Sequence, residues 1–174
     1  VLAVFLLGFG LSVAVPFMSL FGVDFIRMTP LQLGIFLTTT AMSSVVISSV
    51  LARFSDRLPN RRPLVLLTLL AGALAYASLS VLTSYTLIMI SGMILLGLGS
   101  SAFPQLFSFA RAQFNDSPND LAERGLTVLR ATISLAWVIG PALGAVILKI
   151  WSFQGVFLVA GACYVLAILA VVQI

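Results

Sequence analysis

Apolar runs long enough to cross a membrane are the feature that most restricts what this chain can fold into. A spanning helix needs roughly 20 mainly apolar residues. The chain divides into six runs of this kind, at about 1–23, 31–52, 63–83, 86–110, 125–149 and 155–174. Its residues are 61% hydrophobic and only 8% charged, well outside the composition of soluble domains. We therefore predict an all-α membrane protein whose six transmembrane helices form one domain over residues 1–174.

Both ends of the chain fall inside or beside apolar runs. It opens at Val1 and closes at Ile174 while the sixth run is still apolar, so we expect a fragment or one half of a larger assembly. The first run is long and has no basic leader, which favours a membrane span over a cleavable signal peptide. Cys163 is the only cysteine, and we expect it to be a small core residue.

The basic residues indicate how the helices are oriented, because cytoplasmic loops of membrane proteins are enriched in Lys and Arg. Six arginines fall in the loops 53–62 and 111–124, which follow the second and fourth runs: Arg53, Arg57, Arg61, Arg62, Arg111 and Arg124. The opposite side has only Arg27 and Lys149. Both loops and both termini are therefore expected in the cytoplasm.

The first and fourth runs resemble each other. One reads GFGLSVAVPFMSLF from Gly8 and the other GLGSSAFPQLFSFA from Gly97, so both carry glycines, a serine, a proline and a further serine in the same order. Helices interrupted by Gly and Pro at corresponding positions are typical of inverted repeats in secondary transporters. The similarity predicts two inverted three-helix repeats. Chance likeness between two apolar helices is the alternative.

A polar stripe follows one face of the fifth run, LRATISLAWVIGPALG. At 100° per residue, this face collects five side chains: Arg130, Ser134, Trp137, Pro141 and Gly144. A charge at the centre of the bilayer costs about 2.5–3.5 kcal/mol on insertion scales, so we expect Arg130 to face a watery cavity. Alternatively, its long side chain snorkels to the head groups from a position near the cytoplasmic edge.

The fourth and first runs add further polar groups. Gln105 has an amide that both donates and accepts hydrogen bonds, which suits hydroxyl groups. The serines can instead serve packing, because small residues let membrane helices approach and a hydroxyl can bond its own backbone. Packing is our interpretation for the hydroxyl cluster at 40–48 of the second run. The predicted substrate-binding residues are Gln105, Arg130, Ser134, Trp137, Ser101, Ser108, Ser12 and Ser19.

Two glycines and a proline near the end of the fifth run admit two interpretations. Gly140 and Gly144 form a G-x-x-x-G pair that favours close helix contact, and Pro141 removes a backbone N–H and bends the helix. A bent, closely packed helix would also form a hydrophobic seal at the outer end of the bundle. The sequence is compatible with both.

The loop ARFSDRLPNRRP, at 52–63, resembles the loop signature of the major facilitator superfamily, Gly-x-x-x-Asp-Arg-x-Gly-Arg-Arg/Lys. Asp56, Arg57, Arg61 and Arg62 fit this signature, whereas an alanine and a proline stand where it has glycines. A plain positive-inside loop would explain the arginines but not Asp56. The resemblance implies that these four residues take part in conformational gating.

Four further segments resemble the bacterial sugar efflux transporters of that superfamily: PFMSLF, TPLQLGIFLTTTA, GSSAFPQLFSFAR and LRATISLAWVIGPALG. The resemblance implies the N-terminal half of a twelve-helix transporter, with a cavity lined by the first and fourth helices and flanked by the second and fifth. Gly140, Pro141 and Gly144 match the Gly-Pro motif of exporters and are assigned to gating. Met93 departs from the pattern, because drug/proton antiporters carry an arginine four residues before the glycine that is Gly97 here.

The function we expect is that of a secondary active transporter in a bacterial inner membrane, exporting sugars or glycosides by alternating access. Its partners would be the bilayer, a sugar, and a second six-helix half that is either the missing C-terminal half or a second copy. Protons are a candidate coupling ion. We expect no nucleic acid, cofactor or metal, since the chain has no metal-binding cluster or phosphate loop.

Two other classes stay open as alternatives. A multidrug/proton antiporter would usually carry an acid within the membrane, whereas the five acidic residues here lie at span ends or in loops. A non-transporting structural bundle is the other. An enzyme is not expected, because the chain has no histidine and no acid placed to activate a serine or cysteine.

Overall fold

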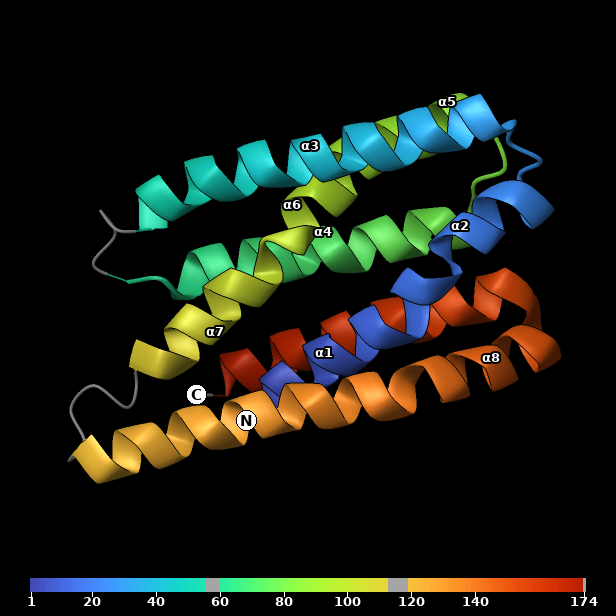
Figure 1. Ribbon diagram of the computed structural model, residues 1–174. Coiled ribbons are helices and arrows are strands. Elements are labelled where there is room, and N and C mark those ends of the chain that lie inside the picture. Colours follow the sequence, from blue (N-terminus) through green and yellow to red (C-terminus); the bar gives the residue numbers. More distant parts are fainter. Residues whose placement is uncertain (56–59, 113–118, 174) are drawn as a thin grey trace.

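The computed structural model describes residues 1–55, 60–112 and 119–173, and all regular structure in these ranges is helical (Figure 1). Five stretches are long and apolar enough to cross a membrane: Leu2–Phe25, Pro30–Ser55, Arg62–Val81, Tyr85–Ala112 and Glu123–Val172. The prediction of an all-α protein with membrane-spanning helices is confirmed at this level. Six runs were predicted and five stretches are found, because the last stretch contains both the fifth and the sixth run.

The last helix, α8 (Asn119–Val172), reverses direction at Ser152. A straight helix of 50 residues would be about 75 Å long, far more than the roughly 30 Å of a bilayer core. Ser152 has φ 63° and ψ −173°, a conformation outside the helical region. Figure 1 shows the chain running out before this point and back after it. We call residues 119–151 the outgoing arm and residues 153–172 the returning arm.

The first membrane stretch is interrupted at a proline. It begins as α1 (Leu2–Ala14), passes through a 3-10 turn at Val15–Phe17, and continues through α2 (Met18–Leu20) into a π-helical segment, Phe21–Phe25. Pro16 causes the interruption, because its ring lacks an N–H and clashes with the carbonyl four residues earlier.

The fourth membrane stretch is interrupted as well. It consists of α5 (Tyr85–Ser91), a π-helical segment at Gly92–Leu96, α6 (Gly97–Ser100) and α7 (Ala102–Ala112). The break between α6 and α7 falls at Ser101. In a continuous helix the ring of Pro104 would clash with the carbonyl of Ser100, four residues earlier, which accounts for a break at this point. Both stretches that begin a proposed repeat therefore depart from straight α-helix.

The second and third stretches are continuous helices, α3 (Pro30–Ser55) and α4 (Arg62–Val81). Helix α3 is capped at its start: Thr29 and Gln32 exchange backbone and side-chain hydrogen bonds of 2.9 and 3.3 Å, and Pro30 is the first helical residue. Just before this cap, Arg27 has a positive φ of 64°, which turns the chain between the first stretch and α3.

The helices pack as a bundle in which α1 lies chiefly against α8, and α4 lies against α8, α6 and α7. The second stretch, α3, packs against α6 and the preceding π-helical segment. Only Phe36 and Ser55 of α3 are buried, so most of this helix is exposed. Both termini lie at the same end of the bundle, together with the end of α3 and the start of α4 (Figure 1).

An aromatic cluster joins the first stretch to α4 and to the returning arm of α8. Phe21 and Phe157 meet edge to face with ring centroids 4.8 Å apart, and Tyr76 lies 6.2 Å from Phe157 and 5.6 Å from Tyr164. All four are buried. Offset and edge-to-face pairs of this kind add to the packing of a core, so the cluster fixes α4 beside the returning arm.

The closest helix approach in this part of the bundle occurs at Gly72 on α4 and Gly99 on α6. A Cβ atom added at Gly99 would lie 2.6 Å from the Cα of Gly72, and one added at Gly72 would lie 2.1 Å from the ring of Tyr164. Only residues without a side chain permit this spacing, as in other membrane helix pairs. The two glycines thus set the position of the fourth stretch against α4.

We predict that Gly99→Ala destabilises the fold, because its methyl group would meet backbone rather than a movable side chain. Overpacking of this kind costs about 1–3 kcal/mol. Gly34→Ala on α3 is the matched control, since its methyl group would meet nothing within 4 Å. The measurement is the thermal midpoint of the purified protein. Equal midpoints for the two variants would contradict this account of the helix contact.

Candidate functional site

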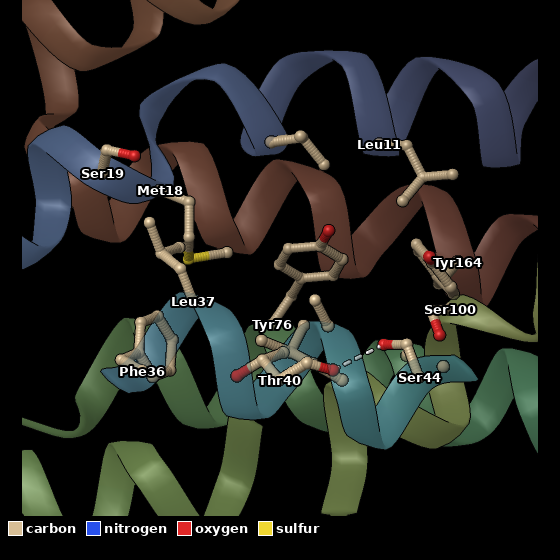
Figure 2. A pocket seen from close by; sticks show the side chains of 15 residues that line it. Leu11, Met18, Ser19, Phe36, Leu37, Thr40, Ser44, Tyr76, Ser100 and Tyr164 are labelled. Atoms are coloured by element: carbon tan, nitrogen blue, oxygen red, sulfur yellow. Dashed lines mark hydrogen bonds between the residues drawn. The ribbon is translucent and has the colours of Figure 1, made fainter. Parts of the chain in front are cut away.

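A central cavity of about 400 Å³ lies between the first stretch and α3, with α4, α6 and the returning arm of α8 behind it (Figure 2). One side is formed by Leu11, Val15, Met18 and Ser19. Its volume falls within the range of about 300–1,000 Å³ typical of small-molecule sites. The interruption at Pro16 shapes this wall, because Val15, Met18 and Ser19 lie at or just beyond the 3-10 turn.

Two tyrosines give the central cavity its most distinctive chemistry. Tyr76 and Tyr164 are 2% and 1% exposed, and both line the cavity. Neither phenol hydroxyl forms a hydrogen bond with the described residues. Figure 2 shows Tyr76 extending from α4 across the cavity toward α1. A buried phenol that lacks a partner is unusual, and it can bond an acceptor or donor on a bound molecule.

The remaining lining is mostly apolar, with hydroxyl groups at a few points. The Oγ1 atom of Thr40 is buried and has no hydrogen-bond partner among the described residues. Ser44 donates to the Thr40 carbonyl at 2.9 Å (Figure 2), and Ser100 donates to the Gly97 carbonyl at 2.8 Å. Apolar walls with a few polar groups are the usual composition of a small-molecule site.

A second cavity, of about 420 Å³, lies between the end of α3 and the first two turns of α7, and we call it the α3–α7 cavity. It shares no lining residue with the central cavity and is lined by Ser48, Ser49, Ala52, Ser55, Arg61, Pro104, Gln105 and Ser108. Arg61 reaches in from the start of α4, and its Nη1 donates to Ser108 Oγ at 2.8 Å. This cavity is markedly more polar than the central one.

The predicted substrate-binding residues fall at four different places. Ser19 lines the central cavity, and Gln105 and Ser108 line the α3–α7 cavity. Ser101 is buried close by, where its Oγ lies 2.8 Å from that of Ser48 on α3. The polar face predicted on the fourth stretch therefore points toward α3.

Ser12 lies at the contact between α1 and the outgoing arm of α8. Its Oγ is 2.8 Å from the carbonyl oxygen of Ala136 and 2.9 Å from that of Phe9. A Cβ added at Gly140 would lie 1.8 Å from this Oγ, and one added at Gly144 would lie 2.8 Å from the Val13 carbonyl. Both glycines thus bring the outgoing arm against α1, which is the packing interpretation of the G-x-x-x-G pair.

The other three predicted residues lie on the exposed side of the outgoing arm and line neither cavity. Arg130, Ser134 and Trp137 are exposed, and Ser134 donates to the Arg130 carbonyl at 3.1 Å. Pro141 is half-buried beside them. The stripe predicted on this helix is therefore divided, with the glycines toward α1 and the polar groups outward.

Of the four predicted loop residues, Arg61 and Arg62 are described and make contacts between elements. Arg61 bonds Ser108 on α7, and Arg62 donates to the carbonyl of Val172 at the end of α8. Asp56 and Arg57 lie outside the described residues. The start of α4 is thus bonded both to α7 and to the returning arm.

Sequence reasoning missed Tyr76, Tyr164 and Thr40. It named no site residue in the third or sixth run and interpreted the hydroxyls of the second run as packing groups. A usable signal was present, because Tyr76 stands in the stretch AGALAYASLS, where small neighbours leave room beside an aromatic ring. Which cavity such a ring faces depends on how α4 packs, and sequence periodicity does not give that.

Apolar helices of membrane length, joined by short connections around internal cavities, define a multi-pass α-helical membrane protein. The chain belongs to the Major Facilitator Superfamily, whose sequence profile matches residues 1–173. The predicted superfamily is confirmed, and membership indicates a transporter.

Relatives within the superfamily match almost the whole chain. A Deinococcus radiodurans protein provisionally named a sugar efflux transporter is 56% identical over 166 residues, which are 95% of this chain and 43% of that protein. Sugar efflux transporter A of Dickeya chrysanthemi is 35% identical over 93% of the chain and 41% of its own length. Sugar efflux transporter C of Escherichia coli is 34% identical over 94% and 41%. The chain spans less than half the length of these relatives.

We predict that Gly140→Leu lowers the yield of folded protein, since the new side chain would overlap Ser12 on α1. Ala162→Leu is the control, because Ala162 is exposed on the returning arm of the same helix. The measurement is the monodisperse fraction after detergent extraction and size-exclusion chromatography. A normal yield of Gly140→Leu would argue against close packing at this position.

Proposed function

We propose that this chain is the N-terminal half of a secondary active transporter that exports sugars or glycosides by alternating access. The observation that carries the proposal is the similarity to three proteins named as sugar efflux transporters, each aligned over more than nine-tenths of this chain. A transporter of this class binds its cargo between two halves that rock against each other. The proposed location is the inner membrane of a bacterium.

Six membrane crossings follow if the two arms of α8 each cross once, and we assign them to two inverted repeats of three within residues 1–174. Both termini lie at the same end of the bundle, as an even number of crossings requires (Figure 1). The first and fourth crossings are the ones interrupted by proline and by π-helical segments. The arginines of loops 53–62 and 111–124 favour a cytoplasmic location for this end.

The second half of the transporter would cover the exposed sides of α3 and of the outgoing arm. Most of α3 is exposed, and Leu135, Trp137 and Val138 are exposed on the arm. The relatives have more than twice the length aligned here, which favours a C-terminal half over a second copy of this chain. In this arrangement Arg130 and Ser134 face that half instead of lipid, which lowers the cost of the charge.

The central cavity is the proposed sugar-binding site of this half. The faces of Tyr76 and Tyr164 suit the apolar C–H faces of a sugar ring, and their hydroxyls suit its oxygens. Ser19 and Thr40 add hydroxyl groups to the walls. Asp56, Arg57, Arg61 and Arg62 are proposed to gate the cytoplasmic end, and Gly140, Pro141 and Gly144 to close the outer end, with protons as a candidate coupling ion.

Export of a labelled disaccharide, beside export of a lipophilic cationic dye, tests the function. We expect the full-length transporter in energised inverted vesicles to accumulate the disaccharide and not the dye. The dye matters because the largely apolar lining of the central cavity also suits drugs. Accumulation of the dye without the disaccharide would contradict the proposal of sugar export and favour the alternative of a multidrug antiporter.

Tyr76→Phe tests the central cavity. The substitution removes one hydroxyl that has no partner in the described structure, so folding should be unaffected. Loss of one or two hydrogen bonds to the sugar should raise its apparent KM about two- to tenfold. Tyr85→Phe is the matched control, since the Tyr85 hydroxyl bonds the Gln32 carbonyl at 3.3 Å outside the cavity. An unchanged KM for Tyr76→Phe would remove this tyrosine from the site.

A further inference from the structure

We propose that the α3–α7 cavity is a second sugar-binding site, separate from the central cavity, at which Gln105 and Ser55 bond the hydroxyls of the cargo. The inference rests on the proposed function, because it takes the cargo to be a neutral sugar. It assigns to this chain two successive sites. The α3–α7 cavity is lined from the end of α3, which lies at the end of the bundle that carries both termini (Figure 1). The central cavity lies between the first stretch and α3.

The side-chain amide of Gln105 is the first group that indicates a ligand in this cavity. The residue is only 6% exposed and lines the cavity, yet its side-chain amide makes no hydrogen bond with the described residues. Buried amides are normally paired, because leaving their donors and acceptor unsatisfied is costly. The backbone N–H of Gln105 bonds the Ser101 carbonyl at 3.2 Å, which holds this residue in the first turn of α7.

Ser55 gives the same indication from the opposite wall. It is 3% exposed, it lines the same cavity, and its Oγ has no partner among the described residues. Ser55 is the last residue of α3, whereas Gln105 lies on α7. A buried hydroxyl without a partner and the unbonded amide of a largely buried glutamine therefore face one cavity of about 420 Å³ from two different helices.

The remaining polar side chains of the cavity are already engaged, and one of these bonds joins two of its walls. Arg61 Nη1 donates to Ser108 Oγ at 2.8 Å, and Ser49 donates to the Val45 carbonyl at 2.7 Å. The arginine thus fixes the start of α4 against α7, one turn from Gln105. Arg61 acts here as a positioning residue for the wall that carries the amide.

The chemistry of the two unsatisfied groups favours a neutral polyhydroxy ligand over an anion. An amide and a hydroxyl each offer both donors and acceptors, and sugar hydroxyls match both kinds. A phosphate ion offers mainly negatively charged acceptor oxygens, which do not match the Gln105 carbonyl oxygen as well as neutral hydroxyls do. The cavity is also large enough for a small molecule, at about 420 Å³.

Protection of a single cysteine by ligand tests the second site in the purified full-length transporter. Ser49→Cys places a thiol on the exposed wall of the α3–α7 cavity, and Ser44→Cys places one in the central cavity as the matched reporter. Each is made in a protein otherwise free of reactive thiols, with the buried Cys163 replaced by serine. The readout is the rate of modification by a small thiol reagent at increasing disaccharide concentration.

We expect the disaccharide to slow modification at both reporters. Gln105→Ala should raise the concentration for half-protection about two- to tenfold at Ser49→Cys, as expected for one hydrogen bond, and leave it unchanged at Ser44→Cys. The unchanged central reporter also shows that the Gln105 variant is folded.

Three results would overturn the inference. Protection at Ser44→Cys alone would leave the proposed function in place and remove the second site. Protection of Ser49→Cys by inorganic phosphate, with none from the disaccharide, would make the α3–α7 cavity an anion site. Absence of disaccharide protection at both reporters, together with absence of disaccharide export, would remove the proposed function itself.

Discussion

The close approach of α6 to α4 at Gly99 and Gly72 is the contact on which both cavities depend. In a bilayer there is little hydrophobic gain from pressing two apolar helices together, so shape decides how near they come. Because neither glycine has a side chain, the fourth stretch lies against α4, and both glycines become part of the central cavity lining. The same contact determines how α7, beyond the break at Ser101, presents Gln105 toward α3.

Two different chemistries follow from this arrangement. The central cavity is largely apolar and aromatic, with the phenols of Tyr76 and Tyr164 as its notable polar groups. The α3–α7 cavity is more polar, and Arg61 at the start of α4 forms part of its wall through a hydrogen bond to Ser108. The loop that carries the superfamily signature is therefore linked directly to a cavity wall.

Serines in this bundle divide between helix contact and cavity lining, and the sequence alone could not separate these roles. Ser12 bonds the Ala136 carbonyl between α1 and α8, and Ser48 bonds Ser101 between α3 and the fourth stretch. Ser12 serves packing, Ser48 bonds Ser101 and also lines the α3–α7 cavity, and Ser55 faces that cavity without a partner. A helical wheel assigns residues to a face, but it does not say whether a neighbouring helix or a cavity lies opposite that face.

The sequence by itself determined the all-α membrane class and the superfamily, because both depend on composition and on motifs of residues close together in the chain. Composition forces helices in a bilayer, since backbone groups must be satisfied within the segment. Only the tertiary structure decided that Gly140 and Gly144 face α1 while Arg130 faces outward, and that Tyr76 and Tyr164 meet at one cavity. Those facts depend on the rotation of each helix about its axis. Close contacts between residues far apart in the chain set that rotation, and local periodicity does not encode it.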